Sequence, residues 1–576
     1  MTRLWNEPAD FANEMVDGFV RANSKWVRKT SGGVARSTRS EAPEVAVVIG
    51  GGSGHYPAFA GLVGPGLAHG AAMGNLFASP SSRQVESIIH ATQQGRGVLL
   101  SYGNYAGDVM HFSTAQAAAR AAGIDCRSVV VTDDIFSAPP TEKAKRRGIA
   151  GDLTVFKVAG AAAAAGHDLD HVERVAILAN ERTRTMGVAF SGCTLPGASE
   201  PLFSVPEGRM AIGLGIHGEP GLEETEVPTA NALSELFVER LLAEAEIPEG
   251  VEAQGARVVP VLNGLGSVKN EELFVVFSRI AELLEAAGIT IVDPQVGEFC
   301  TSFDMAGVSL TLFWLNDELE ELWAAPAHTP AFRTGSMGSA GVVAIESDDS
   351  PTVDEAVAES SPESKAAAAT IAQSLAAIST LIDDNVEELG RLDAVAGDGD
   401  HGIGMQRGAH AAAVAAAQAA ELGAGAQTLL NRAADEWSDR AGGTSGALWA
   451  VILKNLGEHL GDTTEITSQS VSDGVRAASD AVMAYGGASV GDKTLVDALV
   501  PFSESLLTRV EAGDTLAAAW IEAAKQATLA TERTSDMMPG LGRARSHGEK
   551  SVGTPDPGAV SLSLIVTMLG TQLADA

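Results

Sequence analysis

The amino-acid sequence predicts an α/β domain followed by an all-helical domain. Between about residues 45 and 330, short runs rich in β-branched residues alternate with Ala-rich helical segments, which is the pattern of α/β construction. Beyond residue 365, Ala- and Leu-rich helical patterns follow one another and strand-like runs are nearly absent. An acidic stretch rich in Ser and Pro separates the two parts and predicts an interdomain linker over residues 341–365. We therefore expect domains over residues 1–340 and 366–576.

Five apolar runs are the clearest strand candidates of the first domain. They cover residues 45–49, 98–101, 128–131, 258–262 and 309–313. Several of them lead directly into glycine-rich or acidic turns. Because the carboxyl ends of the strands line the binding crevice in this kind of fold, we expect the site of the first domain there.

Eight helical patterns make up the second domain. They cover residues 366–389, 404–421, 426–439, 445–460, 468–485, 493–511, 514–532 and 558–573. Such helices pack into a bundle, and the functional side chains are then expected in the loops between the helices.

Charge narrows the range of partners. The 576 residues include 39 Lys and Arg against 74 Asp and Glu, a formal net charge of -35. A chain of this charge repels nucleic acid and anionic membrane surfaces, so we expect neither as a partner. It also repels the phosphates of a nucleotide, unless local basic groups or a divalent cation compensate.

Cysteine usage and the N-terminal residues predict a cytoplasmic protein. Cys126, Cys193 and Cys300 are far apart and form no C-x-x-C pair, so we expect neither a disulfide framework nor a thiolate metal site. The first residues carry no apolar stretch behind a basic segment. We expect no later segment that approaches the length of a membrane span.

Three polar constellations follow strand-like runs in the first domain. In GGGSGHYP (residues 50–57), glycines let the backbone approach a ligand and Ser53 and His55 add polar side chains, although a tight turn is the simpler alternative. SYGNYAGD (101–108) ends in Asp108, which can act as a general base or cap the following helix. Within residues 210–220, His217 can act as an acid, a base or a nucleophile toward a carbonyl carbon, or be structural.

A cluster of carboxylates marks the second domain. Asp393, Asp398 and Asp400 share one interhelical turn with Gly397 and Gly399. Two unit charges about 4 Å apart repel each other by about 4 kcal/mol at an effective dielectric constant near 20, so the cluster needs a cation. Oxygen ligands without Cys favour Mg²⁺ or Ca²⁺. Because the Glu at the twelfth position of an EF-hand loop is missing, we expect Mg²⁺ together with a nucleotide.

Two further loops fit a nucleotide. GGTSG (442–446) opens a helix, where N–H groups and hydroxyls stabilise phosphate oxygens, although Thr444 or Ser445 can instead be an ordinary N-cap. Residues 540–558 form a long loop that carries Arg543 and Asp556 and could close over a nucleotide. No G-x-x-x-x-G-K-[ST] motif occurs, so the chain is not a P-loop enzyme.

Together these segments resemble the dihydroxyacetone kinase family, in the single-chain form that fuses a substrate domain to a nucleotide domain. The matching motifs are GGGSGH (50–55), GNLFAS (74–79), GNYAGD (103–108), GIHGEP (215–220), GDGDHG (397–402), GDKT (491–494) and DPGA (556–559). They lie in order along nearly the whole chain. The resemblance implies a ketose-binding domain of two α/β subdomains, followed by a helical barrel that binds ATP.

The resemblance also implies roles for residues of the first domain. His217 matches a histidine that holds the carbonyl group of the substrate as a covalent hemiaminal. Asp108 matches the base that takes the proton from the attacking hydroxyl, and His55 its hydrogen-bonding neighbour. The positions that match the lining of the substrate pocket are Gly52, Ser53, Ser79 and Asn104.

In the second domain the resemblance implies a nucleotide site. Asp393, Asp398 and Asp400 match ligands of two Mg²⁺ ions that bridge the ATP phosphates. Positions expected to contact the nucleotide are His401, Gly443, Thr444, Ser445, Thr494, Arg543, Asp556 and Gly558.

The implied activity is the ATP-dependent phosphorylation of a terminal hydroxyl of a short ketose. Ketones and aldehydes form a hemiaminal and simple polyols do not, so the tether itself selects the substrate. Tyr56 stands where many relatives carry Glu, as in the branch that acts on erythrulose, so we expect erythrulose, with dihydroxyacetone as the alternative. Residues 543–547 (RARSH) also depart from the commoner pattern.

Other family activities are alternatives. They are a cyclising lyase acting on FAD, a ketose-sensing regulatory protein and a phosphotransferase-system kinase with bound ADP. An intact Asp108 and aspartate triplet argue against a sensor, and the fused domains favour exchangeable ATP. The resemblance further implies a homodimer, in which the nucleotide domain of one chain can serve the substrate domain of the other.

Overall fold

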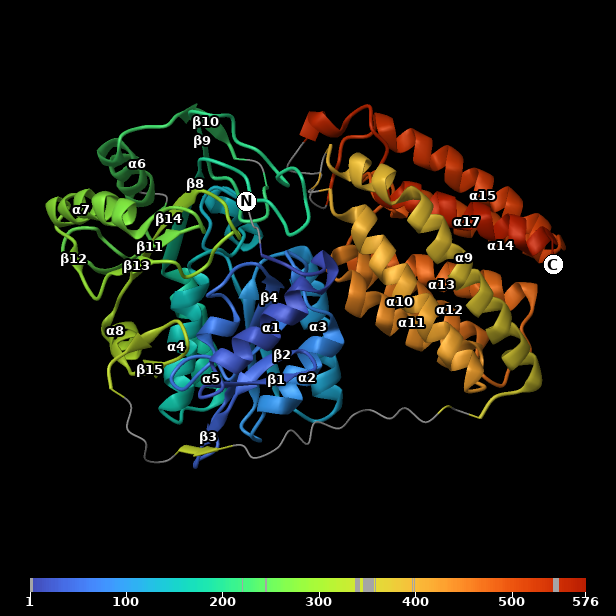
Figure 1. The fold of residues 1–576 in the computed structure, drawn as a ribbon, viewed down its shortest axis with the longest axis horizontal. Helices are drawn as coiled ribbons and strands as arrows, with labels where there is room; N and C mark the ends of the chain where they lie inside the picture. Colours follow the sequence, from blue (N-terminus) through green and yellow to red (C-terminus); the bar gives the residue numbers. More distant parts are fainter. Residues whose placement is uncertain are drawn as a thin grey trace. The chain divides into compact units, whose positions relative to one another are not determined.

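The computed structural model describes residues 4–219, 221–243, 246–336, 342–344, 357, 359–395, 397, 399–541 and 548–575. It divides into two compact units, Met1–Ser350 and Pro351–Ala576 (Figure 1). The linker predicted over residues 341–365 lies largely outside the described residues, and the first helix of the second unit begins within its range, at Pro362.

A six-stranded sheet begins the N-terminal unit (Figure 1). Its strands, in spatial order, are β1 (Val27–Thr30), β2 (Gly33–Arg36), β5 (Gly70–Leu76), β4 (Ala46–Ser53), β6 (Val98–Gly103) and β7 (Cys126–Val131). The last four are parallel to one another, whereas β1 and β2 add an antiparallel edge. The loops that follow the four parallel strands therefore leave the sheet at one edge.

Helices cover both faces of this sheet. Apolar residues of α2 (Ser82–Thr92) and α3 (Ala106–Ala121) pack on one face, where Val48 points. Those of α4 (Asp152–Ala164) and α5 (Leu169–Glu181) pack on the other face, where Val47 points. Strands buried on both faces need continuous apolar runs, which is why the sequence shows them so clearly.

A second sheet completes the N-terminal unit. Its path runs β10 (Glu223–Glu226), β9 (Arg209–Ile212), β8 (Thr183–Ala189), β14 (Gly307–Trp314), β11 (Arg257–Gly264) and β12 (Thr290–Ile291), with β13 (Gln295–Gly297) also paired to β11. Only β12 and β13 run parallel to their partner. Helices α6 (Ala230–Leu242) and α7 (Asn270–Ala286) share its apolar core.

Four of the five predicted strands lie within β6, β7, β11 and β14, the fifth begins one residue before β4, and the predicted fold class is confirmed. Among the strands that the sequence did not reveal, β5 consists largely of Gly and Ala, and the others are short or polar. Arg184 and Thr185 interrupt the apolar run of β8, and Arg209 begins β9. β8 and β9 lie in a mainly antiparallel sheet, where hydrogen-bonded pairing rather than a continuous apolar run specifies the strand.

Eight helices among the described residues form the C-terminal unit. They are α9 (Pro362–Asp393), α10 (His401–Glu421), α11 (Ala426–Ala441), α12 (Gly443–Leu460), α13 (Ser468–Gly486), α14 (Val496–Glu511), α15 (Leu516–Arg533) and α17 (Pro557–Asp575). Each packs against the next, and α17 packs against α9, so the helices close into a ring (Figure 1). All eight predicted helices are present, and the expected barrel is confirmed.

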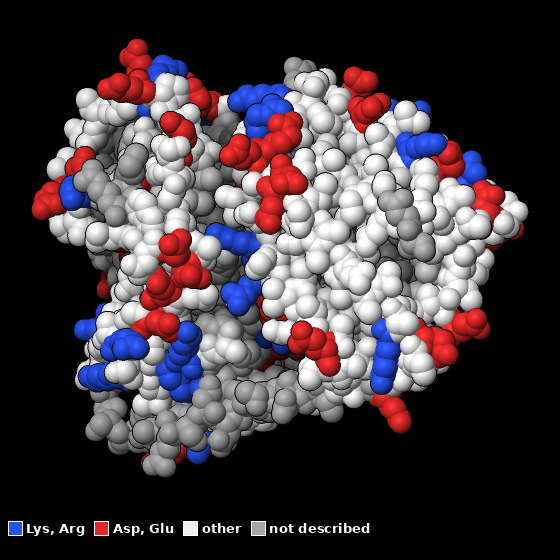
Figure 2. All heavy atoms as spheres, turned by 45° about the vertical axis from the view of Figure 1, so that its right-hand side comes forward, with Lys and Arg blue, Asp and Glu red and all other residues white. Residues whose placement is uncertain are grey.

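Small residues bring these helices close together. The core of the ring contains many alanines, and Gly408 of α10 leaves room for the ring of Trp437, which stacks on Trp449 at 4.9 Å. Much of the surface of the helical unit in Figure 2 carries neither acidic nor basic side chains, in keeping with the Ala-rich helices.

Two helices of the ring, α9 and α17, are long and apolar enough to cross a membrane by length and composition alone. The expectation that no segment approaches such a length is therefore wrong. In this structure Leu375 and Ile382 of α9 and Leu562 and Ile565 of α17 belong to the common core of the ring.

Candidate active site

His55 lies in the loop that follows β4 and is buried. Its Nδ1 donates a hydrogen bond to the carbonyl oxygen of Thr301 at 2.8 Å, because a carbonyl oxygen can only accept. Its ring stacks on Phe77, with centroids 5.0 Å apart. Burial, followed by the neighbouring His217, lowers the pKa of His55 to about 3. On its own, His55 is therefore a neutral imidazole at physiological pH.

His217 lies in the loop after β9, and its ring stands upright in an aromatic box. The rings of His55, Phe77 and Tyr105 lie 4.8, 5.4 and 4.7 Å from it and nearly perpendicular to it. Its Nε2 lies 3.0 Å from Nε2 of His55, and its Nδ1 lies 3.2 Å from Oε1 of Glu219. The structure thus joins the loops of the two sheets at one pair of imidazoles.

The hydrogen bonds of His55 and His217 determine how many protons the two imidazoles hold together. Three hydrogen bonds link Thr301, His55, His217 and Glu219 in series, and each needs one proton. Two neutral imidazoles supply only two N–H groups. With all three bonds formed, the pair holds one extra proton, and the carboxylate of Glu219 balances its charge. A substrate carbonyl that replaces the contact between the two Nε2 atoms can receive this proton.

Asp108 is the third residue of α3 and is buried, with 6% of its surface exposed. Tyr105 occupies the N-cap position, so the alternative that Asp108 caps the helix is wrong. Residues 103–108 follow β6, which lies beside β4 in the sheet, so Asp108 and His55 follow neighbouring parallel strands. This placement matches the crevice expected at the carboxyl ends of the strands.

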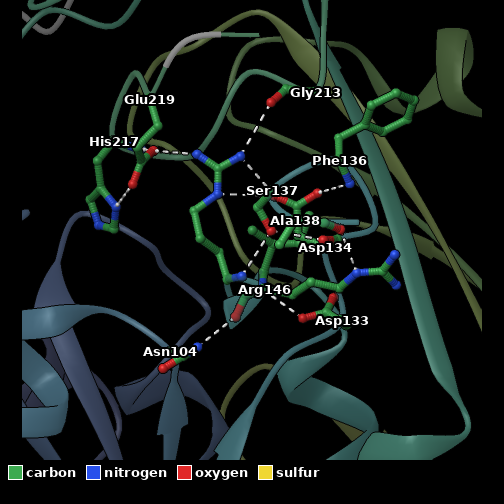
Figure 3. Close-up of polar contacts among 12 residues, drawn as sticks. Asn104, Asp133, Asp134, Phe136, Ser137, Ala138, Arg146, Gly213, His217 and Glu219 are labelled. Atoms are coloured by element: carbon green, nitrogen blue, oxygen red, sulfur yellow. Dashed lines mark hydrogen bonds and ion pairs between the residues drawn. The ribbon is translucent and has the colours of Figure 1, made fainter. Parts of the chain in front are cut away.

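The predicted pocket residues mostly hold backbone in place. Asn104 donates one amide hydrogen to the carbonyl oxygen of Arg146 at 2.7 Å (Figure 3) and another to that of Ala144 at 3.0 Å. Ser53 donates to the carbonyl oxygen of Gly74 at 2.6 Å.

Gly52 and Ser79, the other predicted pocket residues, lie in tightly packed backbone at the end of β4 and after β5. A Cβ on Gly52 would lie 2.9 Å from the backbone nitrogen of Ala78, so only glycine fits. Ser79 is buried in the same segment. Tyr56, by contrast, is 47% exposed and packs edge-to-face on Phe19.

The sequence did not single out Glu219, Tyr105, Phe77 or Thr301. The first three lie inside the matching motifs. Glu219 and Tyr105 are within two residues of a predicted site residue, and Phe77 lies between Gly74 and Ser79. Thr301 carries no sequence signal, because its carbonyl oxygen and not its side chain holds His55.

In the helical unit, the connections that follow α9, α11, α13 and α15 come together. His401 lies 3.3 Å from Ser445 through Nδ1 and 3.1 Å from Ser561 through Nε2. Lys493 donates to the carbonyl oxygen of Ser551 at 2.6 Å. These are the loops that carry the predicted nucleotide motifs, so the structure gathers them at one end of the ring.

Carboxylates gather at this end. Asp393 ends α9 and Asp400 is the N-cap residue of α10. Burial, followed by the charge of Asp393, raises the pKa of Asp400 to about 7. Burial also raises the pKa of Asp556 to about 7, against the hydrogen bond that its Oδ1 accepts from the N–H of Ala559 at 2.7 Å. Asp398 and Arg543 lie outside the described residues.

No group of three or more His, Cys, Asp or Glu side chains is arranged as a metal site within the part of the chain that the structure describes. Asp393 and Asp400 nevertheless provide carboxylate oxygens, the donors that Mg²⁺ prefers. Burial and, after it, the charge of Asp393 raise the pKa of Asp400, and a bound cation would oppose both effects. The residues present therefore fit a magnesium site.

Other predicted nucleotide residues lie at helix starts. Gly442 is the N-cap of α12 at φ 62°, and Gly443 follows at φ 58°, so neither Thr444 nor Ser445 is the cap. Thr494 donates its N–H to Oδ2 of Asp497 at 2.8 Å, just before α14. Gly558 lies at the start of α17.

Comparison with known proteins assigns the family. A Dak1 domain matches residues 17–331 and a DAK2 domain matches residues 395–571. The chain is 56% identical to the L-erythrulose kinase of Pectobacterium atrosepticum, covering 100% of this chain and 97% of that protein. It is 51% identical to the L-erythrulose 1-kinase of Mycolicibacterium smegmatis, covering 100% of both, and 50% identical to the D-erythrulose kinase of that organism, covering 98% and 97%.

A solved structure supports the same assignment. The dihydroxyacetone kinase from C. freundii, in complex with AMP-PNP and Mg²⁺, matches with a TM-score of 0.52 and 28% identity over 99% of both chains. The protein is therefore a two-domain kinase. It belongs to the dihydroxyacetone kinase family.

The raised pKa values of Asp400 and Asp556 predict how stability depends on pH. A carboxyl group whose pKa is higher in the folded state stabilises the fold while protonated, and this contribution is lost as pH rises through the folded pKa. Without divalent cations, the Tm of the helical unit should fall between about pH 4 and about pH 7, by about 2–4 °C for each kcal/mol lost. Excess Mg²⁺ should reduce the fall.

Calorimetry in EDTA and in Mg²⁺ at several pH values measures this effect. Asp400→Asn removes one titrating group and should flatten the curve, whereas Asp435→Asn, which removes a partly exposed carboxylate paired with Lys454, should not. A Tm in EDTA that is independent of pH would contradict the prediction.

Proposed function

We propose that the protein transfers the terminal phosphoryl group of ATP to a terminal hydroxyl of erythrulose. The observation that carries the proposal is the upright imidazole of His217, whose Nε2 faces His55 inside an aromatic box. The three relatives named erythrulose kinases, each covering nearly all of this chain, support a four-carbon ketose. The names of the first two favour the L enantiomer and, in one case, the hydroxyl at C1. Dihydroxyacetone is the alternative substrate.

The ketose is held through its carbonyl carbon. Nε2 of His217 adds to this carbon, and the carbonyl oxygen becomes a hydroxyl beside Nε2 of His55. The substrate keeps its carbon skeleton and its oxidation state. Because the adduct fixes a small molecule in one position, its terminal hydroxyl is presented as an oriented nucleophile.

Asp108 receives the proton of that hydroxyl as it attacks phosphorus. Its position in the first turn of α3, after the strand next to the one that leads to His55, supports this role. Ser79 and the glycine-rich turn at Gly52 line the same edge of the sheet.

The helical unit holds the nucleotide. Asp393, Asp398 and Asp400 would bind Mg²⁺, which supplies charge neutralisation for the transferred phosphoryl group when bound. The complex of the C. freundii enzyme with AMP-PNP and Mg²⁺ supports this assignment, and two ions are our expectation. His401, Ser445, Thr494 and Asp556 lie at the same end of the ring and contact the nucleotide in this proposal.

Substrate selection tests the proposed function. We expect kcat/KM to be highest for L-erythrulose, at least about tenfold above dihydroxyacetone, because the added CHOH group fills polar contacts in the site. Steady-state kinetics with L-erythrulose, D-erythrulose and dihydroxyacetone measure this. Tyr56→Glu, which introduces the residue common in the family, should narrow the difference. A clear preference of the wild-type protein for dihydroxyacetone would refute the assignment to erythrulose.

Loss of His217 should weaken the binding of ketoses specifically. His217→Ala removes the covalent bond, so we expect the KM for erythrulose to rise by at least about tenfold. Calorimetric titration with erythrulose and with erythritol separates the tether from general packing, since the polyol cannot form the adduct. Equal affinity of wild type and variant for erythrulose would exclude a covalent tether.

We also propose a cytoplasmic homodimer in which domains are exchanged between chains. In a symmetric dimer, the nucleotide domain of one chain can serve the substrate domain of the other. Coexpression of Asp108→Asn with Asp400→Asn should then recover about a quarter of wild-type activity, because half of the dimers are mixed and one of their two sites is intact. Sites formed within one chain would recover none.

A further inference from the structure

A line of four charged side chains leads from the loop after β7 to His217. Asp134 accepts hydrogen bonds through Oδ2 from Nη2 and Nε of Arg147, at 2.8 and 3.1 Å. Nη1 of Arg147 lies 3.6 Å from Oε2 of Glu219. The other oxygen of Glu219, Oε1, lies 3.2 Å from Nδ1 of His217. Figure 3 shows His217 beside Glu219, with Asp134 and Gly213 farther from the imidazole.

These charges alternate in sign and are shielded from water. The side chains of Asp134, Arg147, Glu219 and His217 are between 3% and 14% exposed. Burial by itself would raise the pKa of Glu219, but the positive charges of Arg147 and His217 outweigh it and hold the pKa of this carboxyl below its usual range. Glu219 is therefore an ionised carboxylate, which can only accept hydrogen bonds.

Glu219 fixes both the backbone and the ring of His217. Its Oε2 accepts the backbone N–H of His217 at 3.1 Å, and its Oε1 faces the ring nitrogen Nδ1. Because the carboxylate only accepts, the hydrogen on the ring must sit on Nδ1 for this contact to form. In a neutral imidazole the lone pair then lies on Nε2, the atom that points at His55.

Hydrogen bonds fix both the backbone and the guanidinium of Arg147. Its backbone N–H donates to Oγ of Ser137 at 2.9 Å, and its carbonyl oxygen accepts from the N–H of Asp134 at 3.1 Å. Nη2 also donates to the carbonyl oxygen of Gly213, at 3.3 Å, where the His217 loop begins. The guanidinium thus joins the loop after β7 to the loop that carries the tether.

Gly215 leaves the space that this ion pair occupies. A Cβ at this position would collide with Oε2 of Glu219 and would lie 2.5 Å from Nη1 of Arg147. The glycine of the GIHGEP motif therefore serves the contact between Arg147 and Glu219.

We propose that Arg147, oriented by Asp134, is a positioning residue that acts through Glu219 to keep the lone pair of His217 on Nε2, ready to add to the ketone. The inference rests on the proposed tether at His217 and names the residues that set the tautomer of its ring.

When His217 adds to the ketone, the bonds, protons and charge balance among the substrate, His55 and His217. The bond between Nε2 of His217 and the carbonyl carbon forms as the π bond of the carbonyl breaks toward oxygen. That oxygen takes the proton that the two Nε2 atoms shared and that resides on Nε2 of His55 during the attack, so His55 is left neutral. The adduct ring keeps its hydrogen on Nδ1 and gains the positive charge that the pair held before, and this charge faces the carboxylate of Glu219. No proton enters or leaves the solvent.

A neighbouring ion pair provides a matched control. Arg146, the next residue along the chain, binds Glu246 through two hydrogen bonds of 2.9 and 3.0 Å, and its side chain is fully buried. The described contacts of Glu246 are with this guanidinium and not with His217. Glu246→Gln therefore neutralises a buried partner of arginine, as Glu219→Gln does, without touching the line to the tether.

The test follows the adduct directly. Erythrulose labelled with ¹³C at its carbonyl carbon is added to the full-length protein, and the NMR signal of a ketone is compared with that of a tetrahedral carbon. Glu219→Gln can turn its NH2 group toward Nδ1 and place the ring hydrogen on Nε2, so we expect at least about a tenfold smaller population of adduct. Arg147→Gln and Gly215→Ala should act in the same direction, and Arg147→Lys should restore part of the adduct.

The outcomes separate this inference from the proposed function. Loss of adduct in Glu219→Gln and Arg147→Gln, with wild-type adduct in Glu246→Gln, supports the inference. Full adduct in both Glu219→Gln and Arg147→Gln, or an equal loss in Glu246→Gln, overturns it and leaves the tether intact. Absence of a tetrahedral signal in the wild-type protein overturns the tether itself. Circular dichroism and binding of ATP by each variant confirm that both units remain folded.

Discussion

The contact between Nε2 of His55 and Nε2 of His217 joins loops of the two sheets, and the arrangement of the candidate site depends on it. Each imidazole comes from a different sheet, and each is held from behind by an acceptor, the carbonyl oxygen of Thr301 in one case and the carboxylate of Glu219 in the other. Two hydrogen-bond acceptors at the ends and two rings between them leave little freedom for either ring. In the proposed mechanism, the carbonyl group of the substrate replaces the contact in the middle.

The surroundings of this pair are consistent with that constraint. Phe77 stacks on His55 and stands at right angles to His217, while Tyr105 closes the third side of the box. Aromatic rings exclude water and offer few competing hydrogen bonds. The charged side chains of Glu219 and Arg147 lie on the Nδ1 side of His217, and in our proposal they set its tautomer.

Much of this architecture could be predicted from the sequence, and the physical reason is the same in both units. Strands buried on both faces, such as β4 and β6, need unbroken apolar runs, and long helices need periodic ones. The loops that follow them stood out because of Gly, His and Asp. The strands β8 and β9 were missed because they carry arginine and threonine within a mainly antiparallel sheet.

The site was harder to predict where one residue acts through another. His217, His55 and Asp108 were predicted from their motifs. Glu219 lies in the same motif as His217 but was not singled out, and Arg147, 70 residues before His217, lies in no motif. The contact with Thr301 involves a backbone oxygen, which any residue type could supply. Such partners are defined by the fold alone.

The ring of helices has one more consequence. Its helices contact their neighbours along the chain, and the four connections that carry the nucleotide motifs, after α9, α11, α13 and α15, meet at one end. The connections after α10, α12 and α14 are the turns of the same ring that carry none of these motifs. They are the places where this domain could be lengthened, labelled or fused to another protein while the machinery for ATP is left as it is.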